Sequence, residues 1–106
     1  MPRRLRYTLL YAPEVHDHLR VIERAHHALL RWAIGEHLTW APDERTRNRK
    51  PLESSPGPFG ATWELRCGPG NRFRVFYEID MGQREVWILA IGIKAGNRLS
   101  IGGKEY

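Results

Sequence analysis

The chain has 106 residues, which suits one domain over residues 1–106 and leaves no room for a second core. It has one cysteine, Cys67, so no disulfide can form within the chain, and no apolar run is long enough to cross a membrane. The net charge is +5, and 14 of the 17 basic residues are Arg, whose planar guanidinium group binds phosphate through two hydrogen bonds. This balance favours a partner that carries phosphates or an acidic protein segment. Free use of Arg codons in a GC-rich genome would explain the same composition without a functional cause.

The chain begins with a strand pattern followed by a helical one. Residues 5–11 are rich in strand-forming side chains and end just before Pro13, a residue typical of a first helical turn. Apolar residues then recur at helical spacing from Val15 to about Leu38. Because no Pro or Gly interrupts this stretch before Gly35, we expect one long helix or two helices that meet near residues 26–27.

A long irregular connection follows from Pro42 to Ala61. It contains a charge run and then a stretch rich in Pro, Gly and Ser, and connections of this length are usually functional or mobile. Four basic residues lie close together in it: Arg45, Arg47, Arg49 and Lys50.

The last third predicts a three-stranded antiparallel meander. Residues 62–67, 73–80 and 85–94 have strand character, and the turns between them are short. Residues 99–101 are at most an edge strand. The expected fold class is α+β, with an N-terminal strand, a long helix or helical hairpin, a basic loop and the meander, which forms a curved sheet with the helix on one face.

Side-chain alternation divides this meander into two faces. One face is apolar and should form the core against the helix: Trp63, Leu65, Cys67, Phe73, Val75, Tyr77, Ile79, Trp87, Leu89, Ile91 and Ile93. The other face mixes charges, an aromatic ring and small residues: Glu64, Arg66, Arg72, Arg74, Phe76, Glu78, Ile88, Ala90, Gly92 and Lys94. Clustered guanidinium groups suit phosphates, Phe76 is placed to stack a base, and Ala90 and Gly92 would leave room beside them. The alternative is a solvated face whose charges form weak cross-strand ion pairs.

The order of elements and three short segments resemble the RelE/ParE superfamily, the toxins of bacterial type II toxin–antitoxin pairs. The segments are WELR at residues 63–66, RVFYEID at residues 74–80 and ILAIG at residues 88–92. The resemblance runs from about Tyr7 to Lys94. In its RelE branch it implies a ribonuclease that needs no metal or other cofactor and cuts mRNA on the ribosome, where the substrate's 2′-hydroxyl attacks the adjacent phosphate.

The resemblance also implies roles for particular residues. Arg74 lies at the position of the catalytic arginine, and Lys94 lies where relatives place a second basic residue. The resemblance assigns no general base. Glu64 is the candidate from the residues themselves, because a carboxylate beside guanidinium groups can accept a hydroxyl proton. The remaining candidates would hold the RNA: Arg66, Arg72, Phe76, Arg47, Arg49, Lys50 and Arg98.

The chain departs from RelE itself at two places. Thr62 and Glu64 lie where RelE carries lysines, and Tyr106 is the nearest candidate for the tyrosine of its C-terminal segment. Three functions therefore remain open: a ribosome-dependent mRNA endoribonuclease, a ParE-like inhibitor of DNA gyrase, and a non-enzymatic relative that only binds an antitoxin.

All three functions share the same expected partner. A small acidic or amphipathic antitoxin should cover the basic face and fold as it binds, and Trp40 is a candidate for that interface. Operator DNA would be bound only through the antitoxin complex, and no membrane partner is expected. The start of the chain, residues 1–4, lacks the apolar run of a signal peptide, which together with the single cysteine favours the cytoplasm.

The histidines and the cysteine have plainer interpretations. All five histidines fall in the helical region, and none forms the i, i+4 pair of a helical zinc site, so no metal site is expected. His26 lies on the apolar stripe and should be a packing residue. Cys67 should point into the core and be unreactive.

Overall fold

The computed structural model describes residues 5–53 and 57–106. The first four residues, in which the sequence predicts no signal peptide, lie outside the described residues, as do residues 54–56 of the long connection.

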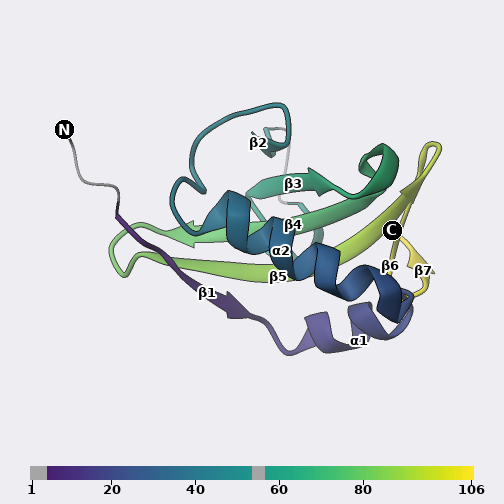
Figure 1. Ribbon diagram of the computed structural model, residues 1–106. Coiled ribbons are helices and arrows are strands. Elements are labelled where there is room, and N and C mark those ends of the chain that lie inside the picture. The colour runs from purple at the N-terminus through teal and green to yellow at the C-terminus, as the bar shows by residue number, and fades with distance from the viewer. Residues whose placement is uncertain (1–4, 54–56) are drawn as a thin grey trace.

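Within the described residues, helix α2 packs across one face of a sheet and helix α1 lies along its β5 edge (Figure 1). The helices are α1 (Glu14–Arg20) and α2 (His27–Leu38), and three short 3-10 turns are η1 (Arg24–His26), η2 (Pro58–Gly60) and η3 (Pro69–Asn71). The strands are β1 (Thr8–Tyr11), β2 (Arg49–Pro51), β3 (Trp63–Cys67), β4 (Phe73–Asp80), β5 (Glu85–Ala95), β6 (Arg98–Ile101) and β7 (Lys104–Glu105). The α+β class is confirmed. The expected strand count is wrong, because the described sheet has seven strands: β2 and the β6–β7 hairpin extend the meander at its two edges.

The strands pair in the order β2–β3–β4–β5–β6–β7, and each of these neighbours is antiparallel. β1 lies parallel to β5 and off this path. The second edge of β5 is therefore shared by two strands, since β1 pairs with residues 85–88 and β6 with residues 92–95. We refer to this edge, shared by β1 and β6, as the divided edge of β5.

His27 shows why the helical region divides in two. Its Nε2 atom lies 3.0 Å from the carbonyl oxygen of Leu19 and 2.9 Å from that of Ile22, and donates to them. Carbonyl groups at the end of a helix have no partner within it, so this ring supplies one where α1 ends. Glu23 then adopts an extended ψ of 136°, and the chain turns into α2. Apolar spacing continues across the break and so could not reveal it.

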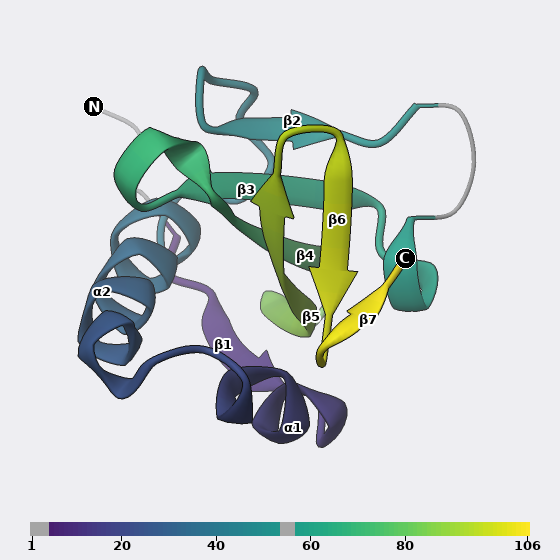
Figure 2. The same ribbon diagram turned by 90° about the vertical axis from the view of Figure 1, so that its right-hand side faces the viewer.

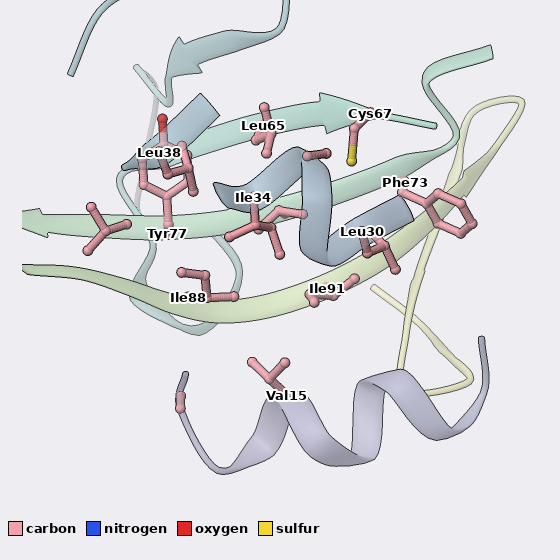
Figure 3. Packing of buried hydrophobic residues seen from close by; sticks show 14 of the residues in the cluster. Val15, Leu30, Ile34, Leu38, Leu65, Cys67, Phe73, Tyr77, Ile88 and Ile91 are labelled. Atoms are coloured by element: carbon pink, nitrogen blue, oxygen red, sulfur yellow. The ribbon is translucent and has the colours of Figure 1, made fainter. Parts of the chain in front are cut away.

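The core lies between the helices and the helix-facing side of the sheet. Leu30, Ile34 and Leu38 of α2 point toward the strands, and Val15 of α1 joins them from below (Figure 3). Most of the predicted strand residues are buried there: Leu65, Cys67, Phe73, Val75, Tyr77 and Ile91. Burial raises the pKa of the Cys67 thiol to about 11, so it stays protonated near neutral pH, as expected for an unreactive cysteine. His26 is half-buried against Phe73, with ring centroids 5.2 Å apart, which fits a packing residue.

A bulge in β5 overturns part of the predicted core. Phe76 pairs with Ala90 but Tyr77 pairs with Ile88, so Leu89 is an extra residue in the ladder. An extra residue reverses the alternation on one side of it. Val86 and Ile88 are therefore buried in the core. The expectation that Trp87 faces the core and Ile88 the opposite side is wrong.

The β6–β7 hairpin covers part of the opposite face of the sheet, on the side away from α2 (Figure 2). A Cβ atom on Gly92 would lie only 2.8 Å from the Ser100 carbonyl oxygen, so the backbone of β6 passes directly over this glycine. Ile101 joins Ala61, Phe76 and Ala90 in a second, smaller apolar cluster. The room expected beside Ala90 and Gly92 is thus filled by the chain itself. In the part of the chain that the structure describes, neither helix is long and apolar enough to span a membrane.

Candidate functional site

We call the face of the sheet away from α2 the outer face. Strand register arranges its residues in two rows. The first row crosses four strands and consists of Lys50, Glu64, Phe76 and Ala90. The second row lies beside it and consists of Arg66, Arg74, Gly92 and Ile101. Neighbouring residues of one face are close enough for long side chains to meet, so the carboxylate of the first row can reach the cations of the second.

Glu64 holds two arginines together. Arg66 donates from Nε to Glu64 Oε1 at 3.1 Å, and Arg74 donates from Nη1 to the same oxygen at 3.5 Å. The side chains of Glu64 and Arg74 are only 10% and 13% exposed, while that of Arg66 is 34% exposed. Arg74 is fixed further by a 3.0 Å hydrogen bond from Nε to the Asn71 carbonyl. The carboxylate therefore offsets the repulsion between two guanidinium groups and keeps both at one place.

A hollow of about 540 Å³ opens beside this cluster. One wall comes from β2, residues 52–53 and residues 57–58, and the other comes from the C-terminal hairpin. The lining residues are Arg45, Lys50, Pro51, Leu52, Glu53, Gly57, Pro58, Glu64, Phe76, Leu99 and Tyr106. Glu64 thus belongs both to the hollow and to the arginine cluster. Tyr106 reaches the hollow because its N–H donates to the Leu99 carbonyl at 2.8 Å, which ties the chain end to β6.

Phe76 does not have the place that base stacking requires. Its side chain is directed to the outer face as predicted, but the residue is only 2% exposed. Ala61, Ala90 and Ile101 pack around the ring, which forms part of the lining of the hollow. The expectation that Phe76 stacks a base is therefore wrong for this structure, because the surrounding side chains leave almost none of the residue exposed.

The four basic residues of the predicted loop differ in placement. Arg49 is turned towards α2, and the other three are not. Lys50 pairs with Glu64 and lines the hollow, whereas Arg49 pairs with Leu65 and is only 9% exposed. The Arg49 guanidinium donates from Nη1 to the carbonyl of His37 near the end of α2, where basic groups are favourable. The prediction that Arg49 binds RNA is therefore wrong, because strand alternation turns its side chain towards the helix. Arg45 and Arg47 are exposed, and Arg45 forms a 3.3 Å ion pair with Glu53.

The remaining basic candidates lie at the far end of the outer face. Lys94 follows Gly92 by two residues and so shares its face, diagonal to Arg74. Its N–H donates to the Arg72 carbonyl at 2.7 Å, which brings these two residues to neighbouring strands. The Arg72 guanidinium lies 5.1 Å from the centre of the Phe73 ring. Arg98 is exposed and pairs with Glu105 at 3.6 Å.

Sequence reasoning missed several lining residues of the hollow. Glu53, Pro58 and Leu99 carry no motif, and only the tertiary structure places them around one hollow. Among residues 5–53 and 57–106, no group of three His, Cys, Asp or Glu side chains is placed to hold a metal ion.

No protein-family model and no curated protein matches the chain. A solved structure does match: the toxin–antitoxin complex RelBE2 from Mycobacterium tuberculosis, with a TM-score of 0.64 and 25% sequence identity. The match covers 85% of this chain and all of the matched chain. This chain has a RelE/ParE-type toxin fold. The Glu64–arginine cluster and the hollow lie on the face of the sheet away from α2.

Proposed function

We propose that this chain is the toxin of a type II toxin–antitoxin pair and cuts mRNA on the ribosome in the cytoplasm, without a metal ion. The similarity to a structure solved as a toxin–antitoxin complex supports the toxin part of this proposal. The observation that carries the nuclease part is the shared oxygen of Glu64, which gathers Arg66 and Arg74 at the edge of an open hollow. Two guanidinium groups held in place are suited to bind one phosphate and the extra charge that it acquires during reaction.

The proposed reaction is an internal transesterification of RNA. The 2′-oxygen of a ribose forms a bond to the adjacent phosphorus, the bond from phosphorus to the 5′-oxygen breaks, and a cyclic phosphate remains. Arg74 and Arg66 stabilise the five-coordinate phosphorus, and Lys94 donates a proton to the departing 5′-oxygen. Glu64 accepts the proton of the 2′-hydroxyl through Oε2, for which the described residues provide no hydrogen-bond partner.

Arg74→Ala tests this proposal. We expect the rate of message cleavage in a reconstituted translation extract to fall by about 10²–10³, the usual effect of removing one preorganised donor to a transition state. Arg20→Ala is the matched control, because it removes the same charge from an exposed position on α1. Cleavage at the normal rate by a folded Arg74→Ala variant would overturn the assignment.

One observation favours the two other functions, which are inhibition of DNA gyrase and antitoxin binding without catalysis. Arg49 and Phe76, both proposed RNA contacts from the sequence, are buried, which leaves fewer groups free to bind RNA. A ParE-like inhibitor would block DNA supercoiling by gyrase and leave RNA intact, whereas a non-enzymatic relative would do neither. Supercoiling and cleavage assays on the same preparation separate the three.

An antitoxin partner follows from the proposed toxin function. The net charge of +5 and the open hollow suit a small acidic or amphipathic protein that covers the basic face. The pair would bind operator DNA through the antitoxin. Trp40 remains exposed and stays a candidate for the interface.

A further inference from the structure

His18 occupies an unusual position at the divided edge of β5. It lies on α1, is only 5% exposed, and accepts a 3.2 Å hydrogen bond at Nδ1 from the backbone N–H of Ile91. Ile91 falls between the segment of β5 that pairs with β1 and the segment that pairs with β6. The His18 side chain thus accepts a hydrogen bond from a strand N–H that neither β1 nor β6 reaches. An unpaired N–H at this buried position would destabilise the fold, because it gives up its hydrogen bond to water and gains none in return.

The same imidazole ring lies beside the supports of both walls of the hollow. Its centroid lies 5.0 Å from that of Phe59, edge-on at 68°, and Phe59 follows directly after Pro58, which lines one wall. On the other side, a Cβ atom on Gly102 would lie 3.4 Å from His18 Cδ2. Gly102 is in the turn between β6 and β7, and this hairpin carries Leu99 and Tyr106 of the opposite wall.

We propose that His18 is a positioning residue that holds the two walls of the hollow in place only while its ring is neutral. A protonated ring carries hydrogen on both nitrogens, so Nδ1–H would face Ile91 N–H and the hydrogen bond would be lost. The ring would have to move, and Phe59 and the Gly102 turn would lose the surface on which they pack. The hollow would then change shape as protons bind. The role in RNA binding rests on the proposed function, whereas the link from His18 to the hollow does not.

The surroundings of the ring determine the direction of this effect. Burial lowers the pKa of His18 from its ordinary 6.5, and Asp17 and then Glu14, both on α1, oppose that shift. The other described elements against the ring contribute the Ile91 N–H, the Phe59 ring and the Gly102 turn, and these three groups carry no charge. Because the folded protein holds the proton less tightly than the unfolded chain, the stabilisation from His18 is fully present above pH 6.5. It is lost as the pH falls from there through the lower pKa of the folded state.

A titration followed by NMR spectroscopy tests the link to the hollow. In the wild-type protein we expect the Ile91 amide and the Tyr106 ring signals to shift with the same midpoint as the His18 ring, below pH 6.5. In His18→Asn these shifts should disappear, because the amide oxygen takes the place of Nδ1 as acceptor and does not titrate. A Tyr106 signal that stays constant while His18 titrates would overturn the proposal, and this outcome needs no variant to fold. An unchanged titration in His18→Asn would overturn it equally.

An RNA cleavage assay tests separately whether His18 positions an RNA-binding site. We expect the KM of the wild type for message to rise severalfold on acidification through the His18 titration, with a smaller change for His18→Asn. His18→Leu, which lacks an acceptor, should have the raised KM at every pH. A wild-type chain that cuts no RNA would contradict the proposed function and leave the NMR result to decide the role of His18. Equal pH profiles of KM for wild type and His18→Asn would show that His18 does not position an RNA site.

Discussion

The two faces of the β3–β4 ladder are held by different forces, although their residues alternate along the same strands. On the helix side, Leu65 and Val75 are directly opposite each other and fully enclosed by apolar side chains. On the outer side, the neighbouring pair Arg66 and Arg74 is held by a single carboxylate, Glu64, next to an open hollow. Packing therefore stabilises one face, while the other keeps charges in a fixed arrangement that packing alone would not favour. Substitutions on the first should reduce stability, and substitutions on the second should mainly change binding and chemistry.

Leu65→Ala should have the largest effect on stability. Removing a fully buried leucine side chain leaves a cavity in a core that cannot fully close around it, so we expect a loss of about 2–5 kcal/mol in the free energy of unfolding. Urea unfolding measures this loss, and cleavage by the fraction that remains folded should be unchanged. Leu29→Ala on the exposed side of α2 is the control and should lose much less. Equal losses at the two positions would mean that the helix side of the sheet is not the main core.

Gly92→Ala tests the boundary between the two faces. The new Cβ atom would lie 2.8 Å from the Ser100 carbonyl oxygen, so β6 must move away, at a cost of about 1–3 kcal/mol. Faster amide hydrogen exchange in β6 than in β3 would show that the hairpin loosens first. Gly35→Ala is the matched control, because nothing lies within 4 Å of a Cβ atom there and alanine favours a helix over glycine. Unchanged exchange in β6 would show that the hairpin tolerates a side chain at this point.

Of the three substitutions, Glu64→Gln should reduce stability least. It removes one negative charge and changes little else. It keeps the shape of the side chain but leaves Arg66 and Arg74 to repel each other, and we expect a loss of about 1–2 kcal/mol, less than for a fully buried pair because Arg66 is partly exposed. Added salt should reduce the loss by screening the repulsion. Glu53→Gln is the control, since its ion pair with Arg45 is exposed and should contribute little. A loss at Glu64 that is independent of salt would contradict a mainly electrostatic role for this carboxylate.

The sequence predicts a structural feature when that feature depends only on residues that are neighbours in the chain. Alternation in β3 and β4 is dictated by the pleat of a single strand, so the buried Leu65 and the outward Glu64 were both predicted correctly. The same rule failed in β5, because a bulge opposite β4 shifts the alternation and no residue type marks it. The composition of residues 42–61 predicts an irregular loop, so alternation cannot place Arg49 until the pairing of β2 with β3 is known.

The sequence by itself determined the class of fold, the pairing of the meander and the placement of Glu64, Arg66 and Arg74 on its outer face. Each of these follows from the period of apolar residues and the length of the turns, which are properties of neighbouring residues in the chain. Only the tertiary structure decided that β6 passes over Gly92, that Phe76 is enclosed and that His18 satisfies the Ile91 N–H. These contacts join residues that are distant in sequence, and they depend on which strand lies at each edge of β5.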